Sequence, residues 1–269
     1  ANTIVGLSNL GAKCGFIGKV KDDGAGKHFK RSMEGLNITF ETPANMEGEP
    51  TAKCLVFVTP DAQRSMNTFL GASTELQPSD ISKDFIGRSK ILYLEGYLWD
   101  PPNAKKAFLE AINIAKASDT KVALSLSDAF CVDRYRSEFL DLVRTHVDIL
   151  FGNETELLSL YQTEDLNEAT ALVKDDCEIV AVTRDSRGSI VIENRLAFEI
   201  AAQKIDTVID TTGAGDLYAS GFLCGMTREM DIQQCGRLGG LAATSIISQF
   251  GARPEESLKP LIDRVAVSN

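Results

Sequence analysis

The sequence has few cysteines and histidines, the residues that form the disulfides of exported domains and the metal sites of metal-dependent ones. Its six cysteines are scattered without a C-x-x-C pair, mostly among apolar residues, which is typical of packed, reduced thiols in a cytoplasmic protein. The two histidines, His28 and His146, have no metal-ligand spacing to each other or to the cysteines. No apolar run is long enough to span a membrane, and the first residues lack a basic-then-apolar signal pattern. We therefore expect a cytoplasmic protein that needs neither disulfides nor a structural metal.

Positive charge is also scarce. The 269 residues include 28 Lys and Arg against 38 Asp and Glu, which gives a formal net charge of −10. This balance argues against a surface that binds nucleic acid or an anionic membrane. Because 43% of the residues are hydrophobic and 25% are charged, the chain can bury the core of one large domain.

Apolar runs alternate with segments of helical period, which predicts an α/β fold with a mostly parallel central sheet. The runs expected as central parallel strands are Lys90–Leu94, Val122–Leu126, Val147–Phe151 and Ile179–Thr183. Helical spacing from Ala104 to Ala115 predicts a helix between the first two strands. We further expect helices over Asn2–Leu10, Gly215–Met226, Ile232–Gln249 and Glu256–Val265, and a strand over Cys14–Val20.

One region breaks the alternation. Three short strand-like runs, Ile38–Phe40, Ala52–Thr59 and Arg64–Phe69, follow one another with turns and no helix between them. This pattern is typical of a small β flap. We therefore expect a β lid over residues 36–69 and an α/β domain made of residues 1–35 and 70–269.

The segment Ile205–Phe222, IDTVIDTTGAGDLYASGF, carries the clearest chemical signal. It predicts a short strand that ends at Asp210, a turn of small residues at 213–215, and a helix. Free N–H groups at a helix N-terminus bind anions, and small residues let a phosphate approach closely. The carboxylate of Asp216 beside such an anion suits a base that takes a proton from an attacking hydroxyl. The alternative is an Asp216 that only stabilises the helix N-terminus.

The string D-T-T-G-A-G-D at residues 210–216 resembles the signature of the ribokinase-like (PfkB) kinases. The resemblance implies a three-layer α/β/α fold with a small β lid. It also implies that Asp216 is the catalytic base, that the amides of Gly213, Ala214 and Gly215 form an anion hole, and that Thr211 meets the nucleotide phosphates.

Two further stretches are similar to family motifs of the nucleotide site. Asn153-Glu154-Thr155-Glu156 resembles N-x-x-E, which implies that Glu156 holds Mg²⁺ through water and that Asn153 lies near ATP. The alternative for Glu156 is a solvated carboxylate in the first turn of a helix. Thr183 and Gly188 match a T-x-G-x-x-G turn beside the nucleotide, with Asp185 in place of the middle glycine.

The turn Phe250-Gly251-Ala252 is similar to the turn that borders the adenine pocket in relatives. An ordinary glycine C-cap is the alternative for Gly251. A monovalent cation such as K⁺ near Asp210 and Thr212 stays an open possibility.

Within the family, the chain most resembles the adenosine kinases, through Val147–Leu157, Leu124–Ser127 and Arg64–Met66. This resemblance implies that Arg64 approaches the transferred phosphate. It implies the acceptor-binding residues Asn2, Met66, Thr68, Tyr97, Leu98 and Asp216. A purine needs flat apolar walls, which Tyr97, Leu98, Trp99 and Phe130 could supply, whereas the alternative for each aromatic is plain core packing.

These observations predict a kinase that uses ATP and Mg²⁺ to phosphorylate the 5′-hydroxyl of adenosine. The alternatives are a PfkB sugar kinase for ribose, fructose or a related sugar, and a noncatalytic nucleoside- or sugar-binding homologue. Family members carry an additional first strand and a Gly-Gly-x-x-x-Asn motif, of which this chain has only Asn2, so we expect that strand to be missing. The sequence leaves both a monomer and a homodimer open.

Overall fold

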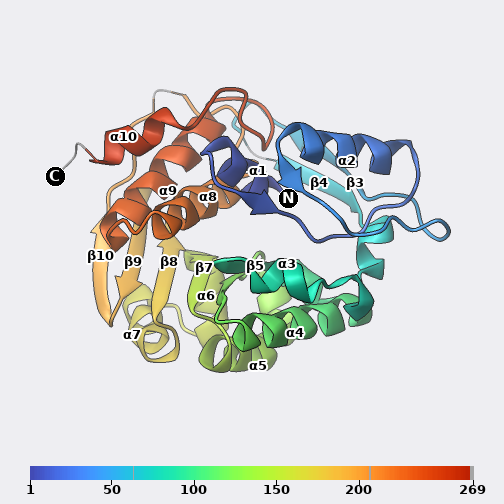
Figure 1. Ribbon diagram of the computed structural model, residues 1–269. Helices are drawn as coiled ribbons and strands as arrows, with labels where there is room; N and C mark the ends of the chain where they lie inside the picture. Colours follow the sequence, from blue (N-terminus) through green and yellow to red (C-terminus); the bar gives the residue numbers. More distant parts are fainter. Residues whose placement is uncertain (63, 206, 267–269) are drawn as a thin grey trace. The chain divides into compact units, whose positions relative to one another are not determined.

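The computed structural model describes residues 1–62, 64–205 and 207–266 (Figure 1). The chain divides into two compact units. The first unit is Ala1–Leu76 with Gln203–Asn269, and the second unit is Gln77–Ala202. Among the helices of the described ranges, none has both the length and the apolar character of a membrane span. The predicted boundary of a lid at residues 36–69 stays a prediction.

The second unit contains a six-stranded sheet in the order β10-β9-β8-β7-β6-β5. Its strands are β5 (Ile91–Glu95), β6 (Lys121–Ser125), β7 (Ile149–Asn153), β8 (Ile179–Thr183), β9 (Ser189–Glu193) and β10 (Leu196–Ile200). Strands β5 to β8 are parallel, whereas β9 and β10 each pair antiparallel with their neighbour. The four predicted strands are thus confirmed as parallel neighbours, but β5 lies at the edge of this sheet and is mostly half-buried, so it is not the central strand that was expected. The apolar side chains of β7 and β8 are buried on both faces.

Among the described residues, the second unit contains five α-helices, of which the first precedes β5 and the other four connect the parallel strands. They are α3 (Lys83–Gly87), α4 (Pro102–Ala117), α5 (Ala129–Thr145), α6 (Glu154–Tyr161) and α7 (Leu166–Asp176). The crossovers from β5 to β8 advance in one direction across the sheet, so right-handed connections place their helices on the same face. Figure 1 shows α4, α5 and α7 gathered on that side. The predicted helix from Ala104 to Ala115 is confirmed as α4, and its small apolar residues are buried.

The first unit contains the helices of both ends of the chain. They are α1 (Asn2–Asn9), α2 (Gly24–Gly35), α8 (Ala214–Thr227), α9 (Ile232–Ile247) and α10 (Pro260–Ala266). Helix α8 packs along α9 and also against α1. The last helix begins at Pro260 and not at Glu256, because proline favours the first helical position and disfavours helical backbone in the residue before it.

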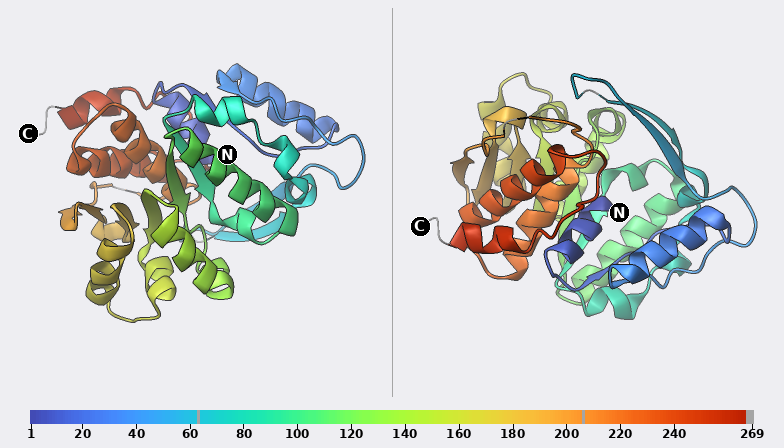
Figure 2. Two further views of the ribbon diagram at one scale, coloured as in Figure 1. Left: turned by 60° about the horizontal axis from the view of Figure 1, so that its bottom comes forward. Right: turned by 90° about the horizontal axis from the view of Figure 1, so that it is seen from above.

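The β segments of the first unit differ from the predicted flap. Strands β3 (Lys53–Val58) and β4 (Arg64–Phe69) form an antiparallel hairpin, drawn as a long ribbon in Figure 2. The run Ile38–Phe40, which was predicted to join them in the flap, is not part of this hairpin. It forms β2 (Ile38–Thr39), which pairs in parallel with β1 (Cys14–Gly15). Ile38 packs into a small core with α1 and α2 residues, and this burial holds β2 away from the hairpin.

Two smaller expectations are also corrected. The strand expected over Cys14–Val20 covers only Cys14 and Gly15, because its partner β2 is itself two residues long. Cys54 lies exposed on β3, so packing does not protect every cysteine, although Cys177, Cys224 and Cys235 are buried.

Candidate active site

The segment before α8 is not the predicted strand. Residues 207–210 have no strand pairing, and Asp206 lies outside the described residues. The N–H of Ile209 donates to the carbonyl of Ile247, the last residue of α9, at 2.8 Å. The segment is therefore anchored to a helix end, which fixes the position of the turn that follows.

The buried carboxylate of Asp210 organises this turn. One of its oxygens accepts hydrogen bonds from the N–H and the hydroxyl of Thr212, at 2.8 and 2.6 Å. The other accepts from the N–H of Gly251 at 2.9 Å. Burial raises the pKa of Asp210, but the bonds from Thr212 and Gly251 and the nearby Arg64 charge outweigh it, so the pKa lies below its ordinary value. Asp210 thus ties the predicted adenine-pocket turn to the predicted phosphate turn.

Helix α8 begins at a turn with a glycine of positive φ. Gly213 precedes it with φ +82°, and a Cβ there would lie 2.8 Å from the Cβ of Ala252. Only glycine fits this conformation and this contact without strain. Among the described residues, the N–H groups of Gly215 and Asp216 have no acceptor, whereas the N–H of Ala214 donates weakly to Thr211 at 3.3 Å. We call residues 211–216 the anion cradle.

The hairpin contributes a cation to the anion cradle. The Nη1 of Arg64 donates to the hydroxyl of Thr211 at 2.6 Å, which brings together two residues 147 positions apart. Because side chains alternate along a strand, Met66 and Thr68 share the Arg64 face of β4. Both are exposed, and Met66 keeps 53% of its surface. The three hairpin residues predicted for the site therefore share one face.

The carboxylate of Asp216 is held by the first turn of α1. Its Oδ2 accepts from the Nδ2 of Asn2, and its Oδ1 accepts from the hydroxyl of Thr3, both at 3.0 Å. The family resemblance predicted Asn2 as an acceptor-binding residue but did not predict its contact with Asp216, and it gave Thr3 no role. These bonds weaken the alternative that Asp216 only stabilises its own helix, since its donors belong to another helix.

In the second unit, the predicted residues follow the carboxyl ends of the parallel strands. The N–H of Gly96, after β5, donates to the hydroxyl of Ser127, after β6, at 2.8 Å, and the Tyr97 hydroxyl donates to the Ser127 carbonyl at 2.8 Å. Open α/β sheets bind ligands at this edge. Nothing in the sequence alone indicated that Ser127 links the two loops.

The aromatic residues of these loops divide into two kinds. Tyr97 and Phe130 are exposed, at 56% and 80%, and Leu98 is half-buried. Trp99 is only 3% exposed, packs edge-on against Phe108, and donates from Nε1 to Glu138. Trp99 is therefore a core residue and not a wall of a ligand site.

Asn153 and Glu156 meet at the start of α6. Asn153 Oδ1 accepts from the N–H of Glu156 at 2.8 Å, while the Glu156 carboxylate accepts from the N–H and the Nδ2 of Asn153, at 3.0 and 2.8 Å. Glu156 is 7% exposed, so it is not the solvated carboxylate of the alternative interpretation. Burial raises its pKa from 4.5 to about 7, assisted by the Asp128 charge and opposed by the bond from Asn153.

Thr183 is the last residue of β8, and Gly188 is the last residue of the turn that follows it. Gly188 has φ +81°. Asp185, in place of the family's glycine, has φ +51°, a conformation that glycine adopts more readily. The turn therefore keeps a glycine-like backbone despite the substitution. Arg187 pairs with Glu154, which links this turn to the start of α6.

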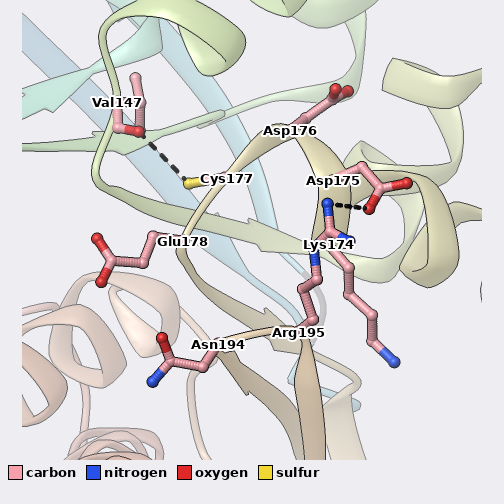
Figure 3. Close-up of a pocket in the computed structure, with 8 residues that line it drawn as sticks. All are labelled: Val147, Lys174, Asp175, Asp176, Cys177, Glu178, Asn194 and Arg195. Atoms are coloured by element: carbon pink, nitrogen blue, oxygen red, sulfur yellow. Dashed lines mark hydrogen bonds and ion pairs between the residues drawn. The ribbon is translucent and has the colours of Figure 1, made fainter.

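A cavity of about 270 Å³ lies at the opposite ends of the strands, where β8 begins (Figure 3). It is lined by Val147, Lys174, Asp175, Asp176, Cys177, Glu178, Asn194 and Arg195. Arg195 pairs with Asp175, and Asp176 accepts bonds from Arg144 and Tyr161. None of the predicted site residues lines this cavity.

The model of the pfkB family carbohydrate kinases matches residues 1–258. The chain belongs to the pfkB family. The family resemblance seen in residues 210–216 is thereby confirmed, and the protein is a pfkB family kinase.

Solved structures agree with the pfkB assignment. The chain is 46% identical to the adenosine kinase from Sinorhizobium meliloti, with a TM-score of 0.95, over 98% of this chain and 81% of that one. It is 45% identical to a probable sugar kinase from Rhizobium etli, with a TM-score of 0.96 and the same coverage. These likenesses confirm the predicted ribokinase-like α/β fold with a mostly parallel sheet.

Among curated proteins, the pfkB chain is 28% identical to 5-dehydro-2-deoxygluconokinase from Listeria monocytogenes. The similarity covers 94% of this chain and 80% of that protein. The relatives thus include kinases named for a nucleoside and kinases named for sugars.

Proposed function

We propose that the chain transfers the γ-phosphoryl group of ATP to the 5′-hydroxyl of adenosine. The observation that carries the proposal is the Asp216 carboxylate, held by Asn2 and Thr3 at a helix N-terminus. The N–H groups of Gly215 and Asp216 at this terminus have no acceptor in the described part of the chain. A base beside an anion site is the arrangement that phosphoryl transfer to an alcohol requires. A protein that only binds a nucleoside or a sugar needs no such base, and this speaks against the noncatalytic alternative.

In this proposal the first unit carries the chemistry. Asp216 takes the proton of the acceptor hydroxyl as the oxygen attacks phosphorus, and Asn2 contacts the acceptor. The N–H groups of Gly213, Ala214 and Gly215 and the Arg64 guanidinium stabilise the negative charge of the transferred group, with Thr211 at the nucleotide phosphates. The turn at Phe250 and Gly251, tied to the cradle by Asp210, borders the adenine.

The second unit supplies further nucleotide contacts in this proposal, from Asn153, Thr183 and Gly188. The hydrogen bonds from Asn153 fix the Glu156 carboxylate, and the remaining lone pair of each oxygen can accept a hydrogen bond from a water molecule on Mg²⁺. Mg²⁺ binds with most of its own waters, which suits this arrangement. When bound, the ion neutralises phosphate charge.

The acceptor is proposed on the loops after β5 and β6. Tyr97 and Phe130 expose large aromatic surfaces there, which suit the faces of a purine better than the hydroxyls of a sugar. The 46% identity to an adenosine kinase supports the same choice. The alternative acceptor is a sugar, which the probable sugar kinase at 45% identity and the 5-dehydro-2-deoxygluconokinases support.

The test is ATP-dependent ADP release with Mg²⁺ and a panel of acceptors: adenosine, ribose, fructose, 5-dehydro-2-deoxygluconate and none. We expect turnover with adenosine that exceeds turnover with each sugar. Phe130→Ala and Tyr97→Ala should raise KM for adenosine, whereas Leu172→Ala, an exposed change on α7, should not. Turnover with a sugar alone would replace the acceptor and keep the kinase. Acceptor binding without ADP release would favour the noncatalytic homologue.

A further inference from the structure

Thr3 is a residue to which neither the motif nor the family match gives a role. It lies in the first turn of α1 and is 2% exposed. Its hydroxyl donates to Oδ1 of Asp216 at 3.0 Å, while Asn2 donates to Oδ2. Since a carboxylate oxygen can accept two hydrogen bonds, each oxygen keeps one position for a further donor. The two bonds therefore define the orientation of the carboxylate without saturating it.

Thr3 is itself held from α8. The hydroxyl of Ser220 is 2.7 Å from the Thr3 carbonyl oxygen and 2.8 Å from the Asp216 carbonyl oxygen, and Ser220 is completely buried. One side chain thus fastens the backbone of Thr3 to the backbone of Asp216. The backbone of Thr3 therefore cannot move relative to the backbone of Asp216 without disturbing this buried contact.

The close approach of the two helices depends on Gly6. A Cβ at that position would lie 2.4 Å from the Ser220 Oγ and 2.8 Å from the Ser220 Cβ. No side chain fits there unless α1 moves away from α8. The glycine therefore permits the helix spacing at which the Thr3 hydroxyl reaches Asp216.

We infer that Thr3 is a positioning residue that fixes the carboxylate of Asp216 in the orientation for proton abstraction. The inference rests on the proposed role of Asp216 as the base. Hydrogen bonds to ionised groups are stronger than neutral ones, and a buried donor has no water to replace it when it is removed. Without the Thr3 hydroxyl, the carboxylate turns about its terminal bond and spends less time in the productive orientation, which lowers the rate of the chemical step.

The experiment compares Thr3→Val, which keeps the shape and removes the hydroxyl, with Thr3→Ser, which keeps the hydroxyl. In full-length protein we expect kcat for the best acceptor to fall about 10-fold or more in Thr3→Val, the loss of one charge-assisted hydrogen bond. KM for ATP should stay unchanged, and Thr3→Ser should restore most of kcat. Ser220→Ala, which keeps the Thr3 hydroxyl but removes its anchor, should give a smaller loss of kcat.

The matched control is Thr120→Val in the second unit. Thr120 is also buried, and its hydroxyl donates to the carbonyls of Ile86 and Ser89. This change should lower the midpoint of thermal unfolding and leave kcat unchanged, which separates loss of stability from loss of positioning.

The outcomes distinguish the two proposals. If the unchanged chain phosphorylates no acceptor, the proposed function fails, and the role of Thr3 fails with it. If the unchanged chain is active and Thr3→Val keeps its kcat, or Thr3→Ser loses as much as Thr3→Val, the role of Thr3 alone is overturned. If Thr3→Val does not fold, the other two variants test the role of Thr3. A lower kcat in Ser220→Ala together with a retained kcat in Thr3→Ser supports the inference. Any other pattern overturns it.

Discussion

Helices α6 and α8 begin with the same local pattern and use it differently. Each has a carboxylate at its third position, Glu156 in α6 and Asp216 in α8. Glu156 exchanges hydrogen bonds with Asn153 at the start of its own helix. Asp216 accepts its bonds from Asn2 and Thr3, more than 200 residues away.

The difference decides which helix end can receive an anion. In α6 the cap residue occupies the N–H of Glu156, and the carboxylate is buried against the cap. In α8 the cap position is Gly213, which has no side chain to offer, and the N–H groups of Gly215 and Asp216 have no acceptor within the described residues. The start of α8 therefore keeps N–H groups available to an anion, whereas the N–H of Glu156 at the start of α6 is already bonded to Asn153.

Loss of the Asp216 charge is the change with the largest expected effect. In Asp216→Asn the side chain keeps its size but cannot take a proton, so we expect kcat to fall by about 10²- to 10⁴-fold. ATP affinity, measured by titration calorimetry, should change little. Asp165→Asn at the N-cap of α7 is the control, because asparagine caps as well as aspartate, and its kcat should not change. Equal turnover in Asp216→Asn and the unchanged chain would remove Asp216 from the mechanism.

The second prediction concerns the cap of α8. Gly213→Ala places a Cβ at φ +82° and 2.8 Å from the Cβ of Ala252, so we expect a loss of about 2–4 kcal/mol in the free energy of unfolding and weaker ATP binding. Gly215→Ala is the matched control, because a Cβ there meets nothing within 4 Å and alanine favours helix. Urea unfolding should show that control to be as stable as the unchanged chain or more so. Equal stability of the two variants would contradict the geometry of the cradle.

The sequence predicted the elements whose signals are local. Buried parallel strands such as β7 and β8 are apolar throughout, and the small residues of the anion cradle are visible as a string. Thr3 and Ser220 were missed because their roles arise only when α1 and α8 pack together, which no local pattern reports. The strand expected before Asp210 was wrong for the same reason, since an apolar run does not reveal that its backbone bonds to the end of α9.

The aromatic residues show the same limit. Trp99 and Tyr97 lie two positions apart, and both were predicted as possible walls of a ligand site. The structure buries Trp99 against Phe108 and exposes Tyr97, and this choice depends on the packing of α4. The resemblance to adenosine kinases therefore located the loop, whereas tertiary packing decided which of its side chains is available to a ligand.

The third prediction tests the buried carboxylate of α6. Burial raises the pKa of Glu156 from 4.5 to about 7, so the folded chain keeps a proton that the unfolded chain loses above pH 4.5. The stability contributed by this proton is therefore present below pH 4.5 and is lost as the pH rises through about 7. In Glu156→Gln this loss is absent, so its free energy of unfolding relative to the unchanged chain should improve by about 3 kcal/mol between pH 4 and pH 8.

Urea unfolding at several pH values checks this expectation. Glu110→Gln, an exposed change on α4, is the control and should show no such trend. A pH-independent difference in stability between Glu156→Gln and the unchanged chain would mean that the Glu156 carboxylate is as well solvated as an ordinary surface glutamate. The buried carboxylate would then no longer distinguish α6 from α8.

The smallest expected effect belongs to the cap of α6. Asn153→Ala removes the acceptor for the N–H of Glu156, so we expect a loss of about 1–2 kcal/mol in the free energy of unfolding at pH 7, measured by urea denaturation. Asn153→Ser keeps a capping oxygen and should recover most of this loss. The backbone N–H of residue 153 still donates to Glu156 in both variants, so the difference between them isolates the cap. If alanine and serine are equally stable here, the start of α6 does not depend on its cap, and the absence of a side-chain cap at Gly213 no longer distinguishes α8.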